Sequence, residues 1–455
     1  MHPEESPMPF DVLVVGGGNA GCAAALAAAR LGAKTALVER YGFLGGTATA
    51  AMVGPWMTFH SGHKRVVGGI AEEIVERLVA MGGSPGHVPD SSDYVPTITP
   101  FDPELHKALL FEMMEEAGVH LLLHAYFLEA LLDDDGVVAG ARFATVGGIR
   151  ELRARFVIDA TADAYVAAAA GVELRQGDAR GRVQPASLIF RVSHVDMHAL
   201  AAYVRTKPKE IRTSLKLHER DPRRLTAVAG LYELWEAARK NGEVDVPREL
   251  VSFFASPYPD EVTVNMTRVL DVDPLDPDDL TRAEIEARRQ AMQLMAFFRR
   301  RVPGFANARI AATGTQIGIR ESRRIVGVYT LTADDVLNAR KFEDAVARSA
   351  YPIDIHNPSG AGTTTHRLPP GATYEIPYRC LVPKSVEGLL VAGRCISTTH
   401  EALASVRLTP TVMTLGQVAG TAAALAARAN VRLRDVEPAR LRAALEAAGV
   451  ILRSA

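Results

Sequence analysis

The sequence predicts an α/β fold with a parallel sheet, into which an α+β domain is inserted. The order strand, glycine turn, helix occurs in residues 11–32 and, with a short polar turn, again in 155–171. An apolar strand and a helix of small residues close the chain at 389–429, whereas 178–350 has a different character. With 455 residues and 48% hydrophobic content, the chain is long enough for two or more buried cores.

The first element pair carries a dinucleotide-binding motif. Val12 to Val15 is a short β-branched run suited to a buried parallel strand, and Gly16, Gly18 and Gly21 follow it as G-x-G-x-x-G. A second strand, 35–38, ends on Glu39, close to the ~20-residue spacing at which an acid accepts the ribose hydroxyls. This context predicts a Rossmann-like site for an adenosine diphosphate cofactor. Glu39 disfavours NADP, and the motif leaves FAD and NAD open.

Composition excludes several classes of protein. The formal charge is -2, from 51 basic and 53 acidic residues, so no nucleic-acid partner is expected. No apolar run is long enough for a membrane span, and no signal peptide is recognised. Three scattered cysteines predict neither a disulfide framework nor a metal site. We therefore expect a cytoplasmic protein with no metal and no membrane partner.

A second glycine turn follows the second strand. In FLGGTAT, Gly45, Gly46 and Thr47 stand where an extended cofactor would pass, so their N–H groups and hydroxyl are expected to contact the pyrophosphate and ribityl chain of FAD. The stretch contains no cysteine, which disfavours the chemistry of flavin disulfide reductases.

The predicted organisation has five segments. Asp102 and Pro103 open an amphipathic helix, 134–136 turn a hairpin, and 196–240 and 278–301 are expected to be helical. The predicted segments are a disordered tail (1–9), the first part of the cofactor domain (10–177), a substrate domain (178–350), the closing part of the cofactor domain (351–430) and a C-terminal helical segment (431–455).

Three stretches together resemble one enzyme family. VVGGGNAGCAAALAAARLGAKTALVER with FLGGTAT, the middle IGIRESRRIVG, and the closing LLVAGRCISTTHEA with LGQVAGTAAA are similar to the FAD-dependent oxidoreductases, relatives of glutathione reductase and the fumarate reductase flavoproteins. The resemblance implies a Rossmann-like FAD-binding domain of the glutathione-reductase type. It also implies that the helix near Pro410 aims its N–H groups at flavin N1 and the C2 carbonyl, where reduced flavin is negative.

The cofactor residues that the motifs and the resemblance imply are Gly16, Gly18, Asn19, Ala20, Gly21, Glu39, Arg40, Gly45, Gly46, Thr47, Ala160, Thr161, Asp163, Gly393, Arg394 and Thr411.

Candidates for catalysis come from the loops expected beside the flavin. His400 and Arg407 lie between the last strand and the last helix, as proton-transfer group and clamp for a substrate anion. His356 and Tyr378 are the other candidates, and Arg320, in IGIRESRR, is a minor one. His400 and His356 could equally be structural histidines, and Arg407 could pair with Glu401.

The predicted function is transfer of a hydride between a small organic substrate and FAD, with an unknown electron partner. One alternative is a NAD-dependent dehydrogenase that uses the first motif alone. The other is a non-catalytic flavoprotein that serves as a redox sensor. The sequence identifies neither the substrate nor the oligomeric state.

Overall fold

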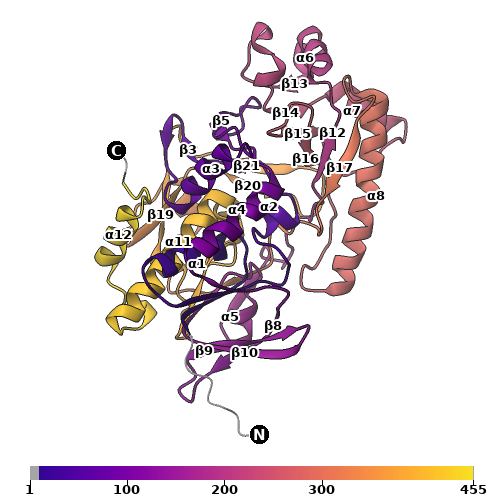
Figure 1. Cartoon of the computed structure of the whole chain (residues 1–455). Coiled ribbons are helices and arrows are strands. Elements are labelled where there is room, and N and C mark those ends of the chain that lie inside the picture. The colour runs from indigo at the N-terminus through magenta and orange to yellow at the C-terminus, as the bar shows by residue number, and fades with distance from the viewer. Residues whose placement is uncertain (1–9, 454–455) are drawn as a thin grey trace.

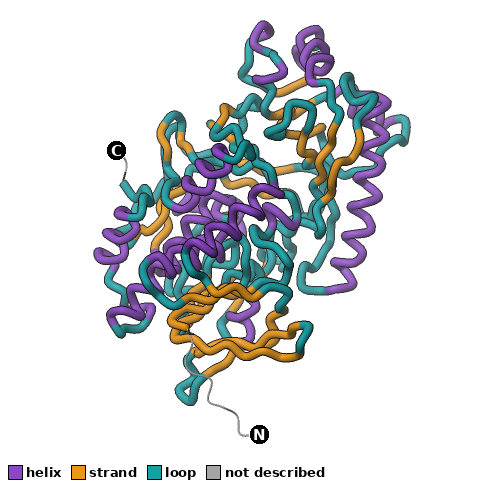
Figure 2. The backbone as a smooth tube through the Cα atoms, viewed as in Figure 1, coloured by secondary structure: helices purple, strands orange, loops and turns teal. Residues whose placement is uncertain are grey.

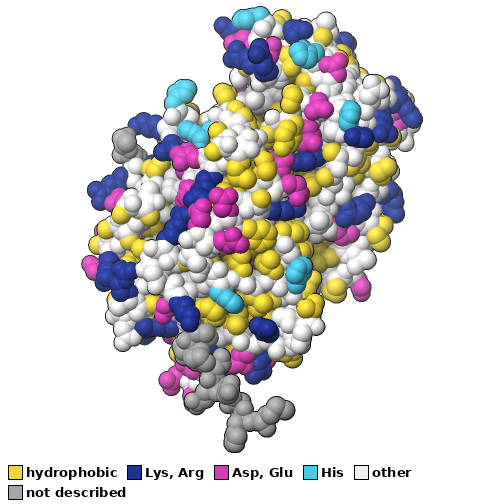
Figure 3. All heavy atoms as spheres, viewed as in Figure 1, with side chains coloured by type: hydrophobic (Ala, Val, Ile, Leu, Met, Phe, Trp, Pro, Cys, Tyr) yellow, Lys and Arg dark blue, Asp and Glu magenta, His cyan; other side chains and the backbone are white. Residues whose placement is uncertain are grey.

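The computed structural model describes residues 10–453, and the tail predicted for residues 1–9 lies outside this range. Figure 1 shows two bodies, with α8 (Pro277–Arg301) at the outer edge of the smaller one. In the described residues no helix is both long and apolar enough to cross a membrane. Basic and acidic side chains are interspersed over the face shown in Figure 3.

The first body is built on a seven-stranded sheet with the order β7-β2-β1-β10-β9-β8 and β23 beside β10. β1, β2, β7, β10 and β23 run parallel, whereas β8 and β9 are antiparallel. The strands are β1 (Phe10–Val15), β2 (Thr35–Val38), β7 (His120–Leu122), β8 (Tyr126–Leu132), β9 (Val138–Thr145), β10 (Gly148–Asp159) and β23 (Leu389–Val391). The predicted α/β fold with a Rossmann-like parallel core is confirmed.

Two helices of small residues cover one face of this sheet. α1 (Asn19–Arg30) and α11 (Thr409–Ala429) lie side by side, indigo against yellow in Figure 1. A Cβ atom at Gly416 would lie 2.0 Å from the Ala20 carbonyl oxygen, and one at Gly420 would lie 2.0 Å from that of Ala24. The glycines therefore let the two helix backbones touch, and the alanine-rich sequence of α1 follows from this packing.

The second body is a six-stranded antiparallel sheet with the order β13-β14-β15-β16-β12-β17. Figure 2 shows its strands as a group apart from the first sheet. Phe297 and Phe298 of α8 pack on it together with Phe305, which follows the helix, and all three are buried. Its elements are β12 (Phe190–Ser193), α6 (Met197–Thr206), β13 (Ile211–Arg212), β14 (Ala227–Gly230), α7 (Tyr232–Lys240), β15 (Val251–Ala255), β16 (Val262–Val264), α8 and β17 (Arg309–Thr313).

Smaller elements complete the first body. The helices are α2 (Thr47–Ala50), α3 (Ile70–Ala80), α4 (Pro103–Glu116), α5 (Tyr165–Ala169), α9 (Ala333–Leu337), α10 (His400–Val406) and α12 (Pro438–Ala447). The strand pairs are β3 (His60–Ser61) with β4 (Lys64–Arg65), β5 (Val88–Pro89) with β6 (Thr97–Ile98), β11 (Leu174–Gln176) with β18 (Arg323–Ile325), β19 (Ala345–Ser349) with β22 (Tyr374–Pro377), and β20 (Ile353–His356) with β21 (Thr363–His366).

Two features of the second body differ from the sequence prediction. Its core extends from Ala186 to Ile317, and the apolar residues from Ile325 to Ala347 belong to the first core, because β18 pairs with β11. The division predicted at residue 350 thus falls near 320. The region 196–240, predicted as helical, also contains β13 and β14. The strand AVAG has no β-branched alternation, so only its neighbours in the sheet specify it.

Candidate active site

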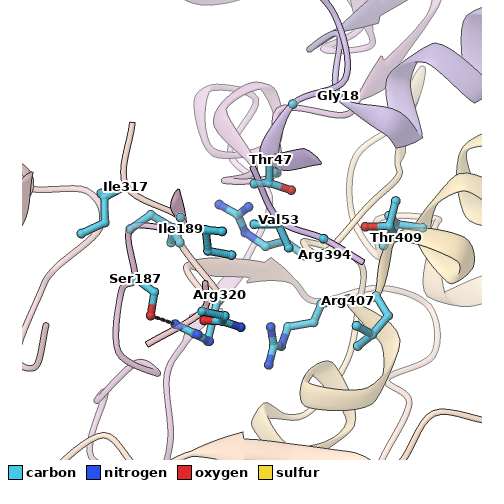
Figure 4. A pocket seen from close by; sticks show the side chains of 18 of the residues that line it. Gly18, Thr47, Val53, Ser187, Ile189, Ile317, Arg320, Arg394, Arg407 and Thr409 are labelled. Atoms are coloured by element: carbon cyan, nitrogen blue, oxygen red, sulfur yellow. Dashed lines mark hydrogen bonds between the residues drawn. The ribbon is translucent and has the colours of Figure 1, made fainter. Parts of the chain in front are cut away.

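One cavity of about 790 Å³ runs between the two bodies. Its lining begins at the carboxyl ends of the parallel strands, with Val15, Val38 and the residues that follow β10. It continues along the second body, where Ile189 and Ile317 line it. Figure 4 shows Gly18 and Thr47 at one end of this space and Arg320 and Arg407 at the other.

The two predicted glycine turns form the first end of the cavity. Gly16 has φ +103°, and a Cβ there would lie 2.5 Å from the Ala160 carbonyl oxygen. The Gly45 N–H donates to the Gly17 carbonyl at 2.9 Å, and a Cβ at Gly46 would lie 2.7 Å from Gly18 Cα. The turns contact each other through bare backbone, and the N-cap of α1, Gly18, has no side-chain cap. Such an uncapped helix start beside glycine backbone suits a pyrophosphate.

Glu39 is held rigidly at the end of β2. Its Oε2 accepts the Gly17 N–H at 2.6 Å and its Oε1 accepts the Tyr41 N–H at 3.0 Å. Burial raises the pKa of this carboxyl, against the lowering effect of these two donors. The carboxylate lines the cavity beside the first glycine turn, which fits an adenosine ribose.

Asp163, in the turn that follows β10, lines the cavity. Asp163 Oδ1 accepts Ser322 Oγ at 2.6 Å and Arg394 Nη2 at 2.5 Å, and the buried Nε of Arg394 has no partner among the described residues. An unpartnered guanidinium nitrogen beside the glycine turns fits a ligand with acceptor oxygens. Asp159, by contrast, is fully buried and serves the turn itself by accepting from Thr161 and Ala167.

The cavity gathers most of the predicted cofactor residues. Those that line it are Gly16, Gly18, Asn19, Ala20, Glu39, Arg40, Gly46, Thr47, Ala160, Thr161, Asp163, Gly393 and Arg394. Three others lie just behind. A Cβ at Gly21 would lie 1.8 Å from the Gly16 carbonyl oxygen, and Gly45 joins the two turns. The hydroxyl of Thr411, in α11, bonds that of Ser349 at the end of β19. Thr409 and Val412 line the cavity in place of Thr411.

At the second end, His356 and Arg407 line the cavity. His356 Nδ1 lies 2.8 Å from Arg268 Nη2, and because a guanidinium only donates, Nδ1 must accept. Nε2 therefore carries the hydrogen, and it faces Asp354 Oδ2 at 3.6 Å. Burial, together with the positive charge of Arg320, lowers the pKa of His356 well below its usual value. His356 is thus a neutral histidine of fixed tautomer.

The other two catalytic candidates do not line the cavity. The Tyr378 hydroxyl is buried and donates to the Leu433 carbonyl at 2.9 Å, and burial raises its pKa far above the usual value. His400 begins α10, and its Nδ1 contacts Glu321 Oε1 at 2.8 Å. Glu321 is fully buried and also pairs with Arg324 at 2.5 Å. Because its ring contacts the buried Glu321, His400 lies behind the residues that line the cavity.

Sequence reasoning missed several residues here. Arg248, Asp354 and Gln316 line the cavity from loops and short strands that carry no motif. The fully buried His106 of α4 holds Asn19 through Nε2 and Oδ1, 2.8 Å apart. Its position on an amphipathic helix gave no signal. Arg320 was visible in IGIRESRR, and the structure brings it to the cavity next to Ser187, at 2.8 Å.

Two curated proteins are similar to part of this chain. Digeranylgeranylglycerophospholipid reductase 2 of Methanopyrus kandleri is 36% identical over 198 residues, which are 43% of this chain and 44% of that protein. Reductase 1 of the same organism is 33% identical over 177 residues, 39% of this chain and 43% of that protein. The alignments thus span less than half the length of these curated relatives.

A solved structure shares the fold across both bodies. A triple mutant of the flavin-dependent brominase Bmp2 superposes with a TM-score of 0.50 at 13% identity, covering 96% of this chain and 84% of that one. The family described as FAD dependent oxidoreductase matches residues 11–445. The protein therefore belongs to the FAD-dependent oxidoreductase family, and its cofactor is FAD.

Proposed function

We propose that the protein catalyses hydride transfer between a small organic molecule and the N5 position of FAD. The observation that carries this proposal is the continuity of one cavity, about 790 Å³ in volume, from the glycine turns to the second body. FAD occupies only part of this lining in the proposal, and the remainder, around Ile189 and Arg320, is left for a substrate. Clefts between domains are the usual sites for small ligands.

The residues proposed to hold FAD act through hydrogen bonds and backbone approach. Glu39 accepts the ribose hydroxyls, and the turns around Gly18 and Gly46 receive the pyrophosphate. Arg394, oriented by Asp163, donates to the flavin or its ribityl chain. Leu408 and Thr409 line the cavity at the uncapped start of α11, so the free N–H groups of that helix favour negative charge beside it. When bound, FAD supplies the two-electron chemistry.

Side chains at the second end position the substrate in this proposal. Arg407 faces it with a permanently charged fork. His356, neutral and hydrogen-bonded to Arg268, holds its hydrogen on Nε2 and is oriented rather than free to accept a second proton at Nδ1. His400, set behind the lining, orients α10 through Glu321. Tyr378 has no catalytic role in this proposal, because its buried hydroxyl donates its hydrogen bond to the Leu433 carbonyl.

The two alternative functions, a NAD-dependent dehydrogenase and a non-catalytic redox sensor, explain fewer of these observations. A NAD-dependent dehydrogenase does not explain membership of a FAD-dependent family. A redox sensor needs no room for a substrate, whereas the cavity extends beyond the cofactor residues along apolar and charged side chains of the second body, such as Ile189 and Arg248.

An anaerobic screen tests the proposal. The purified protein with bound FAD is mixed with candidate organic donors, and bleaching of the flavin absorbance is followed. Reduced protein is then mixed with candidate acceptors in the same way. Bleaching or its reversal by an organic compound supports the proposal. Flavin that is reduced by dithionite but that no organic donor reduces, and no acceptor reoxidises, contradicts it.

A further inference from the structure

Four arginines gather at the second end of the cavity without a carboxylate partner. We call Arg248, Arg268, Arg320 and Arg407 the arginine cluster. Arg248, Arg320 and Arg407 line the cavity, and Arg268 lies behind His356. Within residues 10–453, no aspartate or glutamate oxygen comes within 4.0 Å of any of these guanidinium groups. Arg268 is buried, with 1% of its surface exposed, and the other three are partly buried. Buried arginines are usually paired with a carboxylate, so this set calls for an explanation.

Arg320 is fixed by neutral acceptors alone. Its Nη1 donates to the Pro185 carbonyl at 2.7 Å and to Ser187 Oγ at 2.8 Å. Both contacts come from the segment that enters the second body, so they orient the guanidinium and leave its charge uncompensated. Burial lowers the pKa of Arg320, and the positive charges of Arg407, Arg248 and Arg268 lower it further. The charge of Asp354 acts in the opposite direction and raises the pKa of Arg320.

Arg407 leaves part of its fork unused. Its Nη2 reaches the Asp354 carbonyl at 3.3 Å and Gln184 Oε1 at 3.5 Å, both long contacts, and its buried Nε has no partner among the described residues. In Figure 4 the guanidinium groups of Arg320 and Arg407 project into the same part of the cavity. Two forks that face one space match the two oxygens of an oxyacid group.

The protein itself supplies too little negative charge. Asp354 is buried, and although burial alone would raise its pKa, His356 and Arg407 hold that pKa well below its usual value. Its side chain is directed to His356 Nε2 at 3.6 Å and the Tyr351 hydroxyl at 3.4 Å. Glu249 is exposed. Arg268 adds a further charge, because its other partners, the Gly360 and Gly362 carbonyls and the Thr363 hydroxyl, are all neutral.

Like charges that line one end of a cavity attract an anion, and the cavity is where one can enter. The geometry points to a small organic acid as the substrate, with its carboxylate between Arg320 and Arg407 and Arg248 beyond. This inference rests on the proposed function, because it assigns the substrate of the same cavity. Carboxylate and phosphate share the required chemistry, so the experiment includes both.

The experiment uses the protein with bound FAD and measures the change in flavin absorbance as a ligand is added. The probes are acetate, succinate and benzoate, each paired with its uncharged amide, and inorganic phosphate. We expect at least one carboxylate to shift the spectrum with saturation, and its amide to have no effect. A response to phosphate alone would replace the carboxylate by a phosphate ester. Equal effects of acid and amide, or no saturable shift with any anion, would overturn the inference.

Two glutamine variants, with a lysine variant and a control, locate the effect. Arg320→Gln and Arg407→Gln should each raise the dissociation constant of the acid about tenfold or more, because a charge-assisted pair is lost. Arg320→Lys, which keeps the charge and loses the fork, should fall between. Arg150→Gln, an exposed arginine on β10, is the matched control and should change nothing. Loss of FAD from both cluster variants would instead assign these arginines to the cofactor and overturn the inference.

The outcome is separable from that of the redox screen. If an uncharged compound bleaches the flavin at the same rate in the wild type and both cluster variants, the acid is refuted and the redox function stands. If an acid shifts the spectrum but no compound changes the redox state, the binding site stands and the redox function fails.

Discussion

Glu39 couples the cofactor site to the protein backbone. Its two oxygens each accept a backbone N–H, from Gly17 and Tyr41, and the side chain also lines the cavity. The carboxylate thus fixes the first glycine turn and is at the same time presented to the ribose. We therefore expect even an isosteric substitution of Glu39 to weaken FAD binding.

Replacing Glu39 by glutamine should weaken FAD binding by about tenfold to a hundredfold, because charge-assisted hydrogen bonds are lost. The measurement is the dissociation constant from recovery of FAD fluorescence on dilution. Glu76→Gln, at an exposed position on α3, is the control. An unchanged dissociation constant would mean that the ribose is held elsewhere.

His106 shows how a buried neutral residue makes stability depend on pH. Burial lowers its pKa to about 3. In the unfolded chain His106 has an ordinary histidine pKa and is protonated below about pH 6.5, whereas in the folded protein it stays neutral at the same pH. The contribution of His106 to the free energy of unfolding is therefore full above about pH 6.5. It decreases as the pH falls, by up to about 1.4 kcal/mol per pH unit. His356, whose pKa is also lowered, contributes in the same direction.

Urea unfolding at pH 7, 6 and 5 checks this. The wild-type midpoint should fall with pH, and His106→Gln should reduce the slope, since an amide N–H can still donate to Asn19 without titrating. His63→Gln, at an exposed position, should leave the slope as it is. A slope that His106→Gln does not alter would contradict the assignment.

The pairing of α1 and α11 depends on glycine. Because a Cβ at Gly420 would lie 2.0 Å from the Ala24 carbonyl oxygen, Gly420→Ala forces the helices apart. We expect the free energy of unfolding to fall by about 1–3 kcal/mol. The measurement is chemical unfolding beside Gly147→Ala, where a Cβ meets nothing within 4 Å. Equal stability of the two variants would mean that the helices adjust without cost.

Elements with a strong local signal could be predicted from the sequence. β1, α1 and β2 follow from the glycine spacing and the apolar runs, and Asp102 caps α4 as expected, accepting from Glu104 at 2.6 Å. The last strand and the start of α11 at Thr409 also agree with the prediction. β14 could not be predicted, because AVAG has no strand pattern of its own and is held by β13 and β15.

Long-range contacts explain what the sequence left open at the site. His400 was expected beside the flavin, because its loop must cross the sheet edge, yet its side chain turns to Glu321, 79 residues earlier. The arginine cluster draws members from four separated segments, and only the fold shows that their charges meet. The boundary at 320 likewise depends on β18 returning to pair with β11.

The central claim is that one cavity between the two bodies brings FAD and the substrate together. Its most direct test is the rate of anaerobic flavin reduction in a variant whose cavity is filled. Ile189 is buried and lines the cavity between Thr47 and Arg320 (Figure 4). Ile189→Trp should keep bound FAD and slow reduction by the best compound of the screen about tenfold or more, because the substrate is displaced. Ile149→Trp, at a position 71% exposed, should react as the wild type does. Reduction of Ile189→Trp at the wild-type rate would contradict the account.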